Sequence, residues 1–194
     1  MLEAKSLACE RGGRLVFRNL SFTAKNGDVI ELRGANGSGK SSLLRLIAGL
    51  NQPASGSILF NIEKPLAENA HYIGHSIGVK PALTVTENLD FWQKFFGGQD
   101  QIPLPSFHLE RLADDEARLL SEGQRRRLAL SRLVAVARPL WLLDEPTVGL
   151  DQVALGDLKR EMTKHMKSGG IIIAATHTGL GMDNSRTVEM AEAA

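Results

Sequence analysis

An early glycine-rich stretch combines residue types that bind phosphate. Gly34, Ala35, Asn36, Gly37, Ser38, Gly39, Lys40 and Ser41 have the spacing G-x-x-x-x-G-K-[ST] between a predicted strand and a predicted helix. Glycines let the backbone curl so that its amides point at phosphate oxygens, and a helix start adds positive partial charge. We expect Lys40 to reach the β- and γ-phosphates of a nucleotide and Ser41 to ligate Mg²⁺. The alternative is a glycine-rich turn that happens to precede a helix, and it explains the full spacing less well than a phosphate-binding loop does.

Two adjacent acids follow an apolar segment further along the chain. Residues 140–143 read as a buried strand, and Asp144 and Glu145 come directly after it. Ligands of open α/β sheets bind beyond the carboxyl ends of the strands. We expect Asp144 to hold the magnesium ion and Glu145 to polarise the water that attacks the γ-phosphate. A solvated acidic turn is the alternative, and the phosphate loop upstream favours the site.

The elements that position these residues alternate along the chain. The patterns predict helices over 41–50, 87–96, 107–119, 122–137 and 152–167, and strands over 2–8, 15–17, 20–23, 29–32, 57–60, 70–73, 140–143, 171–175 and 186–190. This alternation is typical of an α/β core with a mostly parallel sheet. We expect a single domain of residues 1–194, with a core of 1–75 and 121–194, an antiparallel β subdomain at the N-terminus, and an inserted helical lobe over 76–120.

Composition excludes several classes of protein. The 194 residues are 43% hydrophobic and 23% charged, which rules out a disordered chain. The net charge of +1 provides no general attraction to nucleic acid or to membranes. The longest plain apolar run, 171–175, is far shorter than the roughly 20 residues that cross a membrane. The only cysteine, Cys9, cannot form an intrachain disulfide, so we expect a reducing compartment, the cytoplasm.

Further motifs complete a recognisable set. They are Ser121-Glu122-Gly123-Gln124, Gly149-Leu150-Asp151 and His177. Together with the phosphate loop and the acidic pair, they resemble the motifs of the nucleotide-binding domain of ABC ATPases, which has a P-loop NTPase fold. The resemblance implies ATP and Mg²⁺ as ligands and a homodimer in the ATP-bound state. Ser121, Gly123, Gln124 and Asp151 would then contact ATP held by the second copy, and His177 would hold the γ-phosphate and the attacking water. Glu122 replaces the usual glycine, so we expect it to point away or to pair with an arginine.

A second resemblance narrows the family. ABC ATPases normally have a glutamine where this chain has His75. The stretch from Tyr72 to Leu89, with Gly-His, Gly-x-Lys and Leu-Thr-x-x-Glu-Asn-Leu, is similar to the ATP-binding subunits of haem exporters in cytochrome c biogenesis. This similarity implies a separate transmembrane subunit, no nucleic-acid partner, and a peripheral position on the cytoplasmic face of the bacterial inner membrane. An imidazole offers one donor and one acceptor, as a glutamine amide does, but it titrates near neutrality, so we expect His75 to make hydrolysis pH-dependent.

Several other residues carry expectations. Arg11 stands near the position of the aromatic residue that normally stacks on adenine, and a guanidinium can stack on a base as well. Phe91, Trp92, Phe95 and Phe96 form either a docking surface for the membrane subunit or, for two of the four, the core of the lobe. The run Arg125-Arg126-Arg127 is interpreted as a cationic helix face, in preference to a contact with phosphate or a partner.

Other functions stay open at this point. An ABC-type ATPase of another export system, or one acting on DNA or ribosomes, would share these motifs. The DNA-repair members have a long coiled coil and the translation factors have two cassettes, and neither feature occurs in this sequence. A small-molecule kinase with a phosphate loop would need an acceptor site and an arginine-bearing lid, and the Ser121 to Gln124 element argues against it.

Overall fold

A five-stranded parallel sheet forms the centre of the computed structural model, which describes residues 1–61, 65–98 and 104–190. Its strands are β3 (Val29–Arg33), β5 (Ala70–Ile73), β6 (Leu140–Asp144), β7 (Ile171–Ala175) and β8 (Ser185–Glu189), in the order β5-β6-β7-β3-β8. Every residue of β6 and β7 is buried, which their continuous apolar sequences predict for strands covered on both faces.

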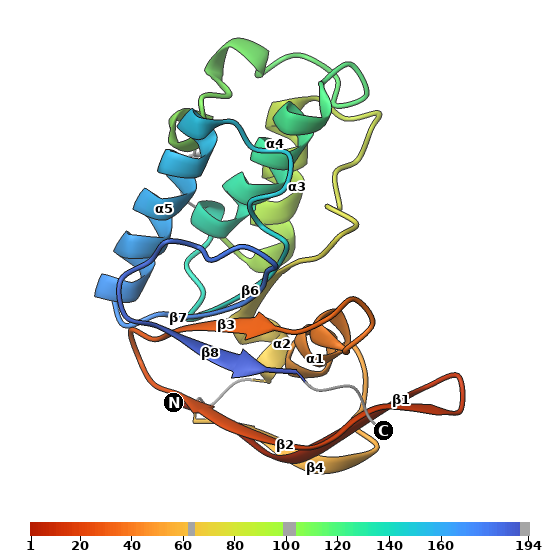
Figure 1. Ribbon diagram of the computed structural model, residues 1–194. Helices are drawn as coiled ribbons and strands as arrows, with labels where there is room; N and C mark the ends of the chain where they lie inside the picture. The colour runs from red at the N-terminus through yellow and green to blue at the C-terminus, as the bar shows by residue number, and fades with distance from the viewer. Residues whose placement is uncertain (62–64, 99–103, 191–194) are drawn as a thin grey trace.

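A second sheet lies below the first in Figure 1. It is antiparallel, with the order β2-β1-β4, and consists of β1 (Leu2–Arg11), β2 (Arg14–Ala24) and β4 (Ser55–Phe60). The hairpin between β1 and β2 turns at Gly12 and Gly13, both with positive φ, a conformation that glycine adopts without strain. The predicted break between 17 and 20 is absent from the structure. β2 runs through it as one irregular strand, with Asn19 at a φ of 54°.

Five α-helices pack around the sheets in the described part of the chain: α1 (Lys40–Ile47), α2 (Leu66–Asn69), α3 (Val85–Phe96), α4 (Glu122–Ala135) and α5 (Gln152–Lys167). In Figure 1, α3, α4 and α5 lie above the parallel sheet, and α1 lies between the two sheets. Thr84 and Ser121 each cap a helix through a capping box, and the Asp151 side chain caps α5. The helix starts therefore follow from local sequence.

Alternate residues of the parallel strands supply two apolar cores. Ile30, Leu142 and Ile173 pack toward α1 and the antiparallel sheet. Their neighbours Val29, Leu143 and Ile172 pack on the other face, toward α3, α4 and α5. Because side chains alternate across a strand, the sheet is buried on both faces and only its ends are open. The α/β fold class with a mostly parallel sheet is thus confirmed, and the described parallel sheet has no antiparallel strand.

The predicted helix over 107–119 is wrong. The structure has two short 3₁₀ helices there, Leu104–Phe107 and Glu110–Leu112, followed by turns. The carbonyl groups of Ala113 and Asp115 accept hydrogen bonds from the first turn of α3 instead of from a helix of their own. Long-range pairing therefore outweighs local helix propensity. Residues 99–103 of the predicted lobe lie outside the described part of the chain, and the division into core and lobe remains a prediction.

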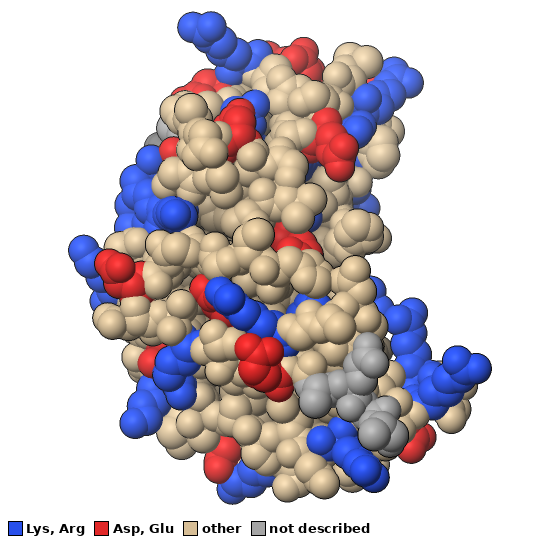
Figure 2. Space-filling model, in the orientation of Figure 1, with Lys and Arg blue, Asp and Glu red and all other residues tan. Residues whose placement is uncertain are grey.

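The surface shows no single-sign face in the view that Figure 2 gives. Basic and acidic side chains are interspersed over most of this face, and basic side chains gather at the lower right. This distribution agrees with the net charge of +1.

Asn88 organises the start of the lobe and provides a test of the fold. Its side chain is buried and bonds four main-chain groups, donating to the carbonyls of Lys80, Leu83 and Thr84 and accepting from the Lys80 amide. We predict that Asn88→Ala lowers the free energy of unfolding by about 2 to 3 kcal/mol, because four hydrogen bonds of a buried side chain are lost together. The Lys80 amide loses its acceptor, whereas each of the three carbonyls keeps a main-chain donor. Denaturant unfolding measures this. The exposed Asn51 is the control, and Asn51→Ala should change stability by no more than about 0.5 kcal/mol. Equal effects of the two substitutions would contradict the prediction.

Candidate functional site

The carboxyl ends of the central strands open into one cleft. The phosphate loop follows β3, His75 follows β5, Asp144 ends β6 with Glu145 directly after it, and His177 follows β7. The cleft has a volume of about 370 Å³. It is lined by Arg11, Val16, Asn36, Gly37, Gly39, Lys40, Ser41, Ser42, His75, Asp144, Glu145 and His177. Residues from five separate parts of the sequence thus face one space, at the edge of the sheet where α/β proteins bind ligands.

The phosphate loop has the backbone conformation that its glycines permit. Gly34, Gly37 and Gly39 have φ values of 147°, 89° and 95°, which side-chain-bearing residues rarely adopt. Two of these glycines are also closely packed: a Cβ atom on Gly34 would lie 2.5 Å from the Met190 carbonyl oxygen, and one on Gly39 would lie 2.7 Å from Val16 and Phe17. Gly39 provides no side-chain cap for α1. The amides at the start of this helix are therefore available to an anion.

Lys40 and Ser38 add polar groups to the same loop. Lys40 is only 8% exposed, and its Nζ donates to the carbonyls of Gly34 at 2.7 Å and Ala35 at 2.9 Å. These bonds hold the ammonium group beside the loop. The Ser38 hydroxyl is buried and has no hydrogen-bond partner in the described structure. The loop thus offers both a cation and an unsatisfied donor, groups that suit a phosphate ligand.

Ser41 and Asp144 meet at the base of the cleft. The Ser41 hydroxyl donates to Asp144 Oδ1 at 3.0 Å, although 103 positions separate the two residues. Mg²⁺ prefers oxygen ligands and binds through one or two protein groups together with phosphate oxygens. An adjacent hydroxyl and carboxylate beside a phosphate loop fit this ion.

Glu145 and His177 lie together at the mouth of the cleft. Glu145 Oε1 is 3.6 Å from His177 Nε2, and both side chains are partly exposed. Glu145 has a φ of 50°, and its amide donates to the Ala175 carbonyl at 2.9 Å. His75 lines this cleft and also a neighbouring cleft of about 360 Å³, which Glu145 shares with Glu122 and Arg126. A carboxylate and an imidazole beside a phosphate site can together orient and deprotonate a water molecule.

The remaining predicted ligands gather in a different place. Ser121, Gly123, Gln124 and Asp151 line a small pocket of about 80 Å³ that shares no residue with the phosphate cleft. Ser121 and Gln124 form a capping box, and Asp151 Oδ1 accepts a hydrogen bond from the Ala154 amide at 2.8 Å. Glu122 lines the neighbouring cleft instead of this pocket and forms no ion pair among the described residues. Its position agrees with the expectation that it points away.

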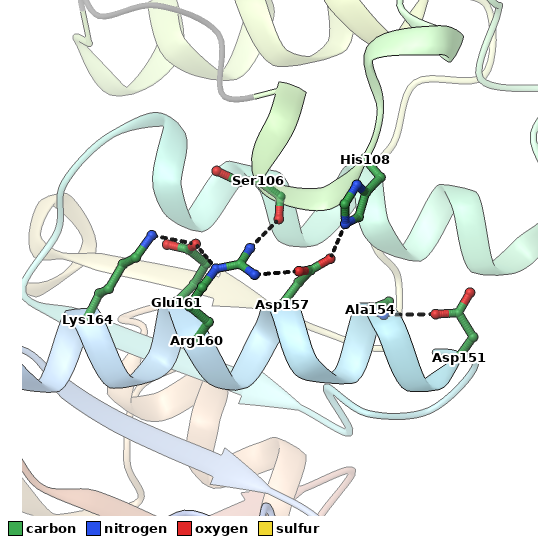
Figure 3. A network of polar contacts seen from close by, with 8 residues as sticks. All are labelled: Ser106, His108, Asp151, Ala154, Asp157, Arg160, Glu161 and Lys164. Carbon is green, nitrogen blue, oxygen red and sulfur yellow. Dashed lines mark hydrogen bonds and ion pairs between the residues drawn. The ribbon is translucent and has the colours of Figure 1, made fainter.

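Helix α5, which begins beside this second pocket, contacts residues 106 and 108. Figure 3 shows Arg160 bonded to Asp157 and Glu161 of its own helix and to the Ser106 carbonyl, with distances of 2.7, 3.3 and 3.3 Å. His108 lies 3.2 Å from Asp157. The hydrogen bond to Asp157 raises the pKa of Arg160 above its usual value. Asp151 caps the start of the same helix.

The arginine run differs from its prediction. The interpretation as a cationic face is wrong for Arg126, which is buried and donates from Nη2 to the main-chain oxygens of Asp144 and Glu145. Arg132 in the same helix is buried as well and lies 4.4 Å from the centre of the Trp92 ring. The sequence did contain a signal for the burial of Arg126. It stands four residues before Leu130, so both side chains lie on the same face of the helix, and Leu130 is buried.

The sequence matches known proteins over most of its length. Residues 17–148 match the family model described as ABC transporter. The cytochrome c biogenesis ATP-binding export protein CcmA of Rhodopseudomonas palustris strain BisB5 is 50% identical over 187 residues, 93% of this chain and 94% of that protein. The CcmA of Bradyrhizobium diazoefficiens is 48% identical over 192 residues, 94% of each chain.

Solved structures show the same fold. The ATP-binding subunit of an ABC transporter superposes with a TM-score of 0.88 and 25% identity over 97% of this chain and 85% of that one. A dimeric ATP-binding cassette in a post-hydrolysis state, bound to ADP and Pi, superposes with a TM-score of 0.83 and 22% identity over 98% and 94% of the two chains.

The loop glycines give a test of the site's packing. We predict that Gly39→Ala lowers the free energy of unfolding by about 1 to 3 kcal/mol more than Gly37→Ala. Both substitutions place a side chain at a positive φ, but only the Cβ at position 39 meets Val16 and Phe17, whereas the one at 37 meets nothing within 4 Å. Thermal unfolding of the nucleotide-free protein measures the difference. Identical losses would show that steric contact at Gly39 does not matter.

Proposed function

This chain belongs to the ABC transporter family, and from that premise we propose that it is the ATP-hydrolysing subunit of the haem exporter of cytochrome c biogenesis. The observation that carries the proposal is the convergence of Lys40, Ser41, Asp144, Glu145 and His177 on one cleft. Phosphoryl transfer to water needs groups that bind the phosphates, groups that hold a metal ion and a base, and this cleft has all three.

The mechanism follows from where each group lies. The loop amides and Lys40 bind the phosphates of ATP and fix them against the start of α1. Ser41 and Asp144 would hold Mg²⁺, which when bound supplies positive charge to the phosphate oxygens. Glu145 accepts a proton from the water whose oxygen bonds to the γ-phosphorus, and the bond from that phosphorus to the bridging oxygen of ADP breaks. His177 orients the same water and the γ-phosphate.

A second copy of the chain completes the site. Ser121, Gly123, Gln124 and Asp151 line a pocket away from the phosphate cleft of their own chain. The start of α4 carries positive partial charge and a serine hydroxyl, a combination that binds phosphate. We expect a head-to-tail homodimer in which this pocket covers ATP held by the other protomer.

Arg11 is our candidate for the base contact. It lines the cleft with Val16, beside the phosphate loop. A guanidinium stacked on a purine and the apolar Val16 side chain would support adenine with less base discrimination than an aromatic ring.

The membrane subunit would dock on α3. Within residues 1–61, 65–98 and 104–190, none of the helices has the length and apolarity that a membrane span requires. Phe91, Trp92, Phe95 and Phe96 contact one another along α3, and Phe95 is 67% exposed. None of the four belongs to the two buried cores, but Trp92 and Phe96 are partly buried and lie against the buried Arg132 and His71. The alternative that two of the four form the core of the lobe therefore stays open. We place the complex at the cytoplasmic face of the inner membrane, with this chain peripheral.

Glu145→Gln tests the proposed catalytic role. We predict that it lowers ATP hydrolysis at least 100-fold while ATP binding persists, because an amide cannot accept the proton of the attacking water. The ATP-bound dimer should accumulate and co-isolate with the membrane subunit in an affinity pull-down from membranes. Phosphate release by the isolated complex measures the rate, and the exposed Glu110→Gln is the control. Hydrolysis at the wild-type rate would contradict the assignment.

Phe95→Ala tests the docking surface. We predict that it weakens co-isolation of the membrane subunit several-fold while basal hydrolysis stays unchanged, because Phe95 is exposed on α3 and lies outside the phosphate cleft. Leu119→Ala is the control, since Leu119 is similarly exposed at 72% but lies outside α3. Equal retention of the membrane subunit by the two variants would place the docking surface elsewhere.

A further inference from the structure

Arg126 is a buried charge that the proposed mechanism does not use. It is 7% exposed, and burial lowers the pKa of its guanidinium. A guanidinium in a protein nevertheless remains protonated, so the helix α4 carries a positive charge into the interior. Burying such a group costs folding free energy unless hydrogen bonds compensate for the lost water. The partners of Arg126 must therefore supply that compensation.

The partners of Arg126 are main-chain oxygens at the end of β6. Nη2 donates to the Asp144 carbonyl at 3.0 Å and to the Glu145 carbonyl. Both acceptors are backbone groups, so the arginine fixes the path of the chain and leaves the two carboxylates to other contacts. Asp144 contacts Ser41, and Glu145 faces His177.

Glu145 needs such support. Its φ of 50° lies in the left-handed region, which a residue with a side chain adopts only when surrounding contacts hold it there. Its amide donates to the Ala175 carbonyl and its carbonyl accepts from Arg126, so hydrogen bonds hold it on both sides. In this conformation its carboxylate lies 3.6 Å from His177.

The helix that carries Arg126 also carries the second half-site. Ser121 and Gln124 bond reciprocally in the first turn of α4, which makes that turn rigid. Arg126 follows in the next turn. The Arg126 side chain therefore connects the main chain of Glu145 to the start of α4, which in the proposed dimer faces the second copy.

We propose that Arg126 is a positioning residue for hydrolysis: it holds the left-handed backbone of Glu145 and links it to the Ser121 element at the start of α4. This inference rests on the proposed function. Closure of the Ser121 element over the ATP of the second copy then sets the geometry of Glu145 in the first copy. The two ATP sites of the dimer are coupled through this arginine.

Arg126→Met tests the positioning role, since methionine keeps an apolar stem but donates no hydrogen bond. The expected result is a kcat at least tenfold below wild type, with the Kd for the non-hydrolysable analogue AMPPNP and Mg²⁺ within twofold. Arg125→Met is the matched control: Arg125 is the adjacent arginine, it is only partly buried, and no side-chain hydrogen bond joins it to the described residues. A wild-type kcat in Arg126→Met, or an equal loss in both variants, would overturn the inference.

Arg126→Lys keeps the charge but lacks the planar fork of donors. We expect its kcat to lie between those of wild type and Arg126→Met, with unchanged affinity for AMPPNP. If Arg126→Met does not fold by circular dichroism, this variant decides: a kcat below half of the wild-type value supports the role, and a wild-type kcat overturns it.

A double-mutant cycle with Ser121→Ala tests the link to α4. If Ser121 acts on Glu145 through Arg126, the loss in the double variant should be smaller than the product of the two single losses. Independent, multiplicative losses would overturn the link. Failure of the proposed function is distinguishable, because wild-type protein without ATP hydrolysis, or hydrolysis that persists in Lys40→Ala, contradicts that function whatever Arg126 does.

Discussion

The hydrogen bond between the Ser41 hydroxyl and the Asp144 carboxylate joins the two halves of the site, and it depends on the whole sheet. Ser41 follows β3 and Asp144 ends β6, and β7 lies between these strands. Side chains from both can meet only because all strands of this sheet are parallel and end at one edge. The buried alternation of apolar residues on both faces holds that edge in place.

The residues proposed to bind ATP lie in two regions of each chain. The phosphate cleft is built on strand ends, whereas the Ser121 and Asp151 pocket is built on the starts of α4 and α5. Contacts of α5 with Ser106 and His108 join the second region to the segment that precedes α4. In the proposed dimer each ATP site is complete only when two copies meet, so that proposal links hydrolysis to association.

Residues of the phosphate cleft have unusual backbone conformations, both in the phosphate loop and at Glu145. The loop glycines adopt positive φ at no cost, but Glu145 must combine a positive φ with a carboxylate side chain. The strain is offset by hydrogen bonds from distant parts of the chain, from Arg126 and to Ala175. Strained backbone at Glu145, the proposed catalytic position, requires a rigid surrounding structure, which the packing of α4 on the sheet supplies.

Local patterns were sufficient for much of this protein. The phosphate loop, the acidic pair at the end of β6 and the start of α4 depend on residues within a few positions of one another, so their types and spacing were enough to predict them. The helix predicted over 107–119 failed because Ala113 and Asp115 pair with the distant start of α3. The direction of Arg126, the conformation of Glu145 and the separation of the two half-sites also arise from contacts between remote segments. Local propensity carries no information about such contacts, and tertiary packing alone decided them.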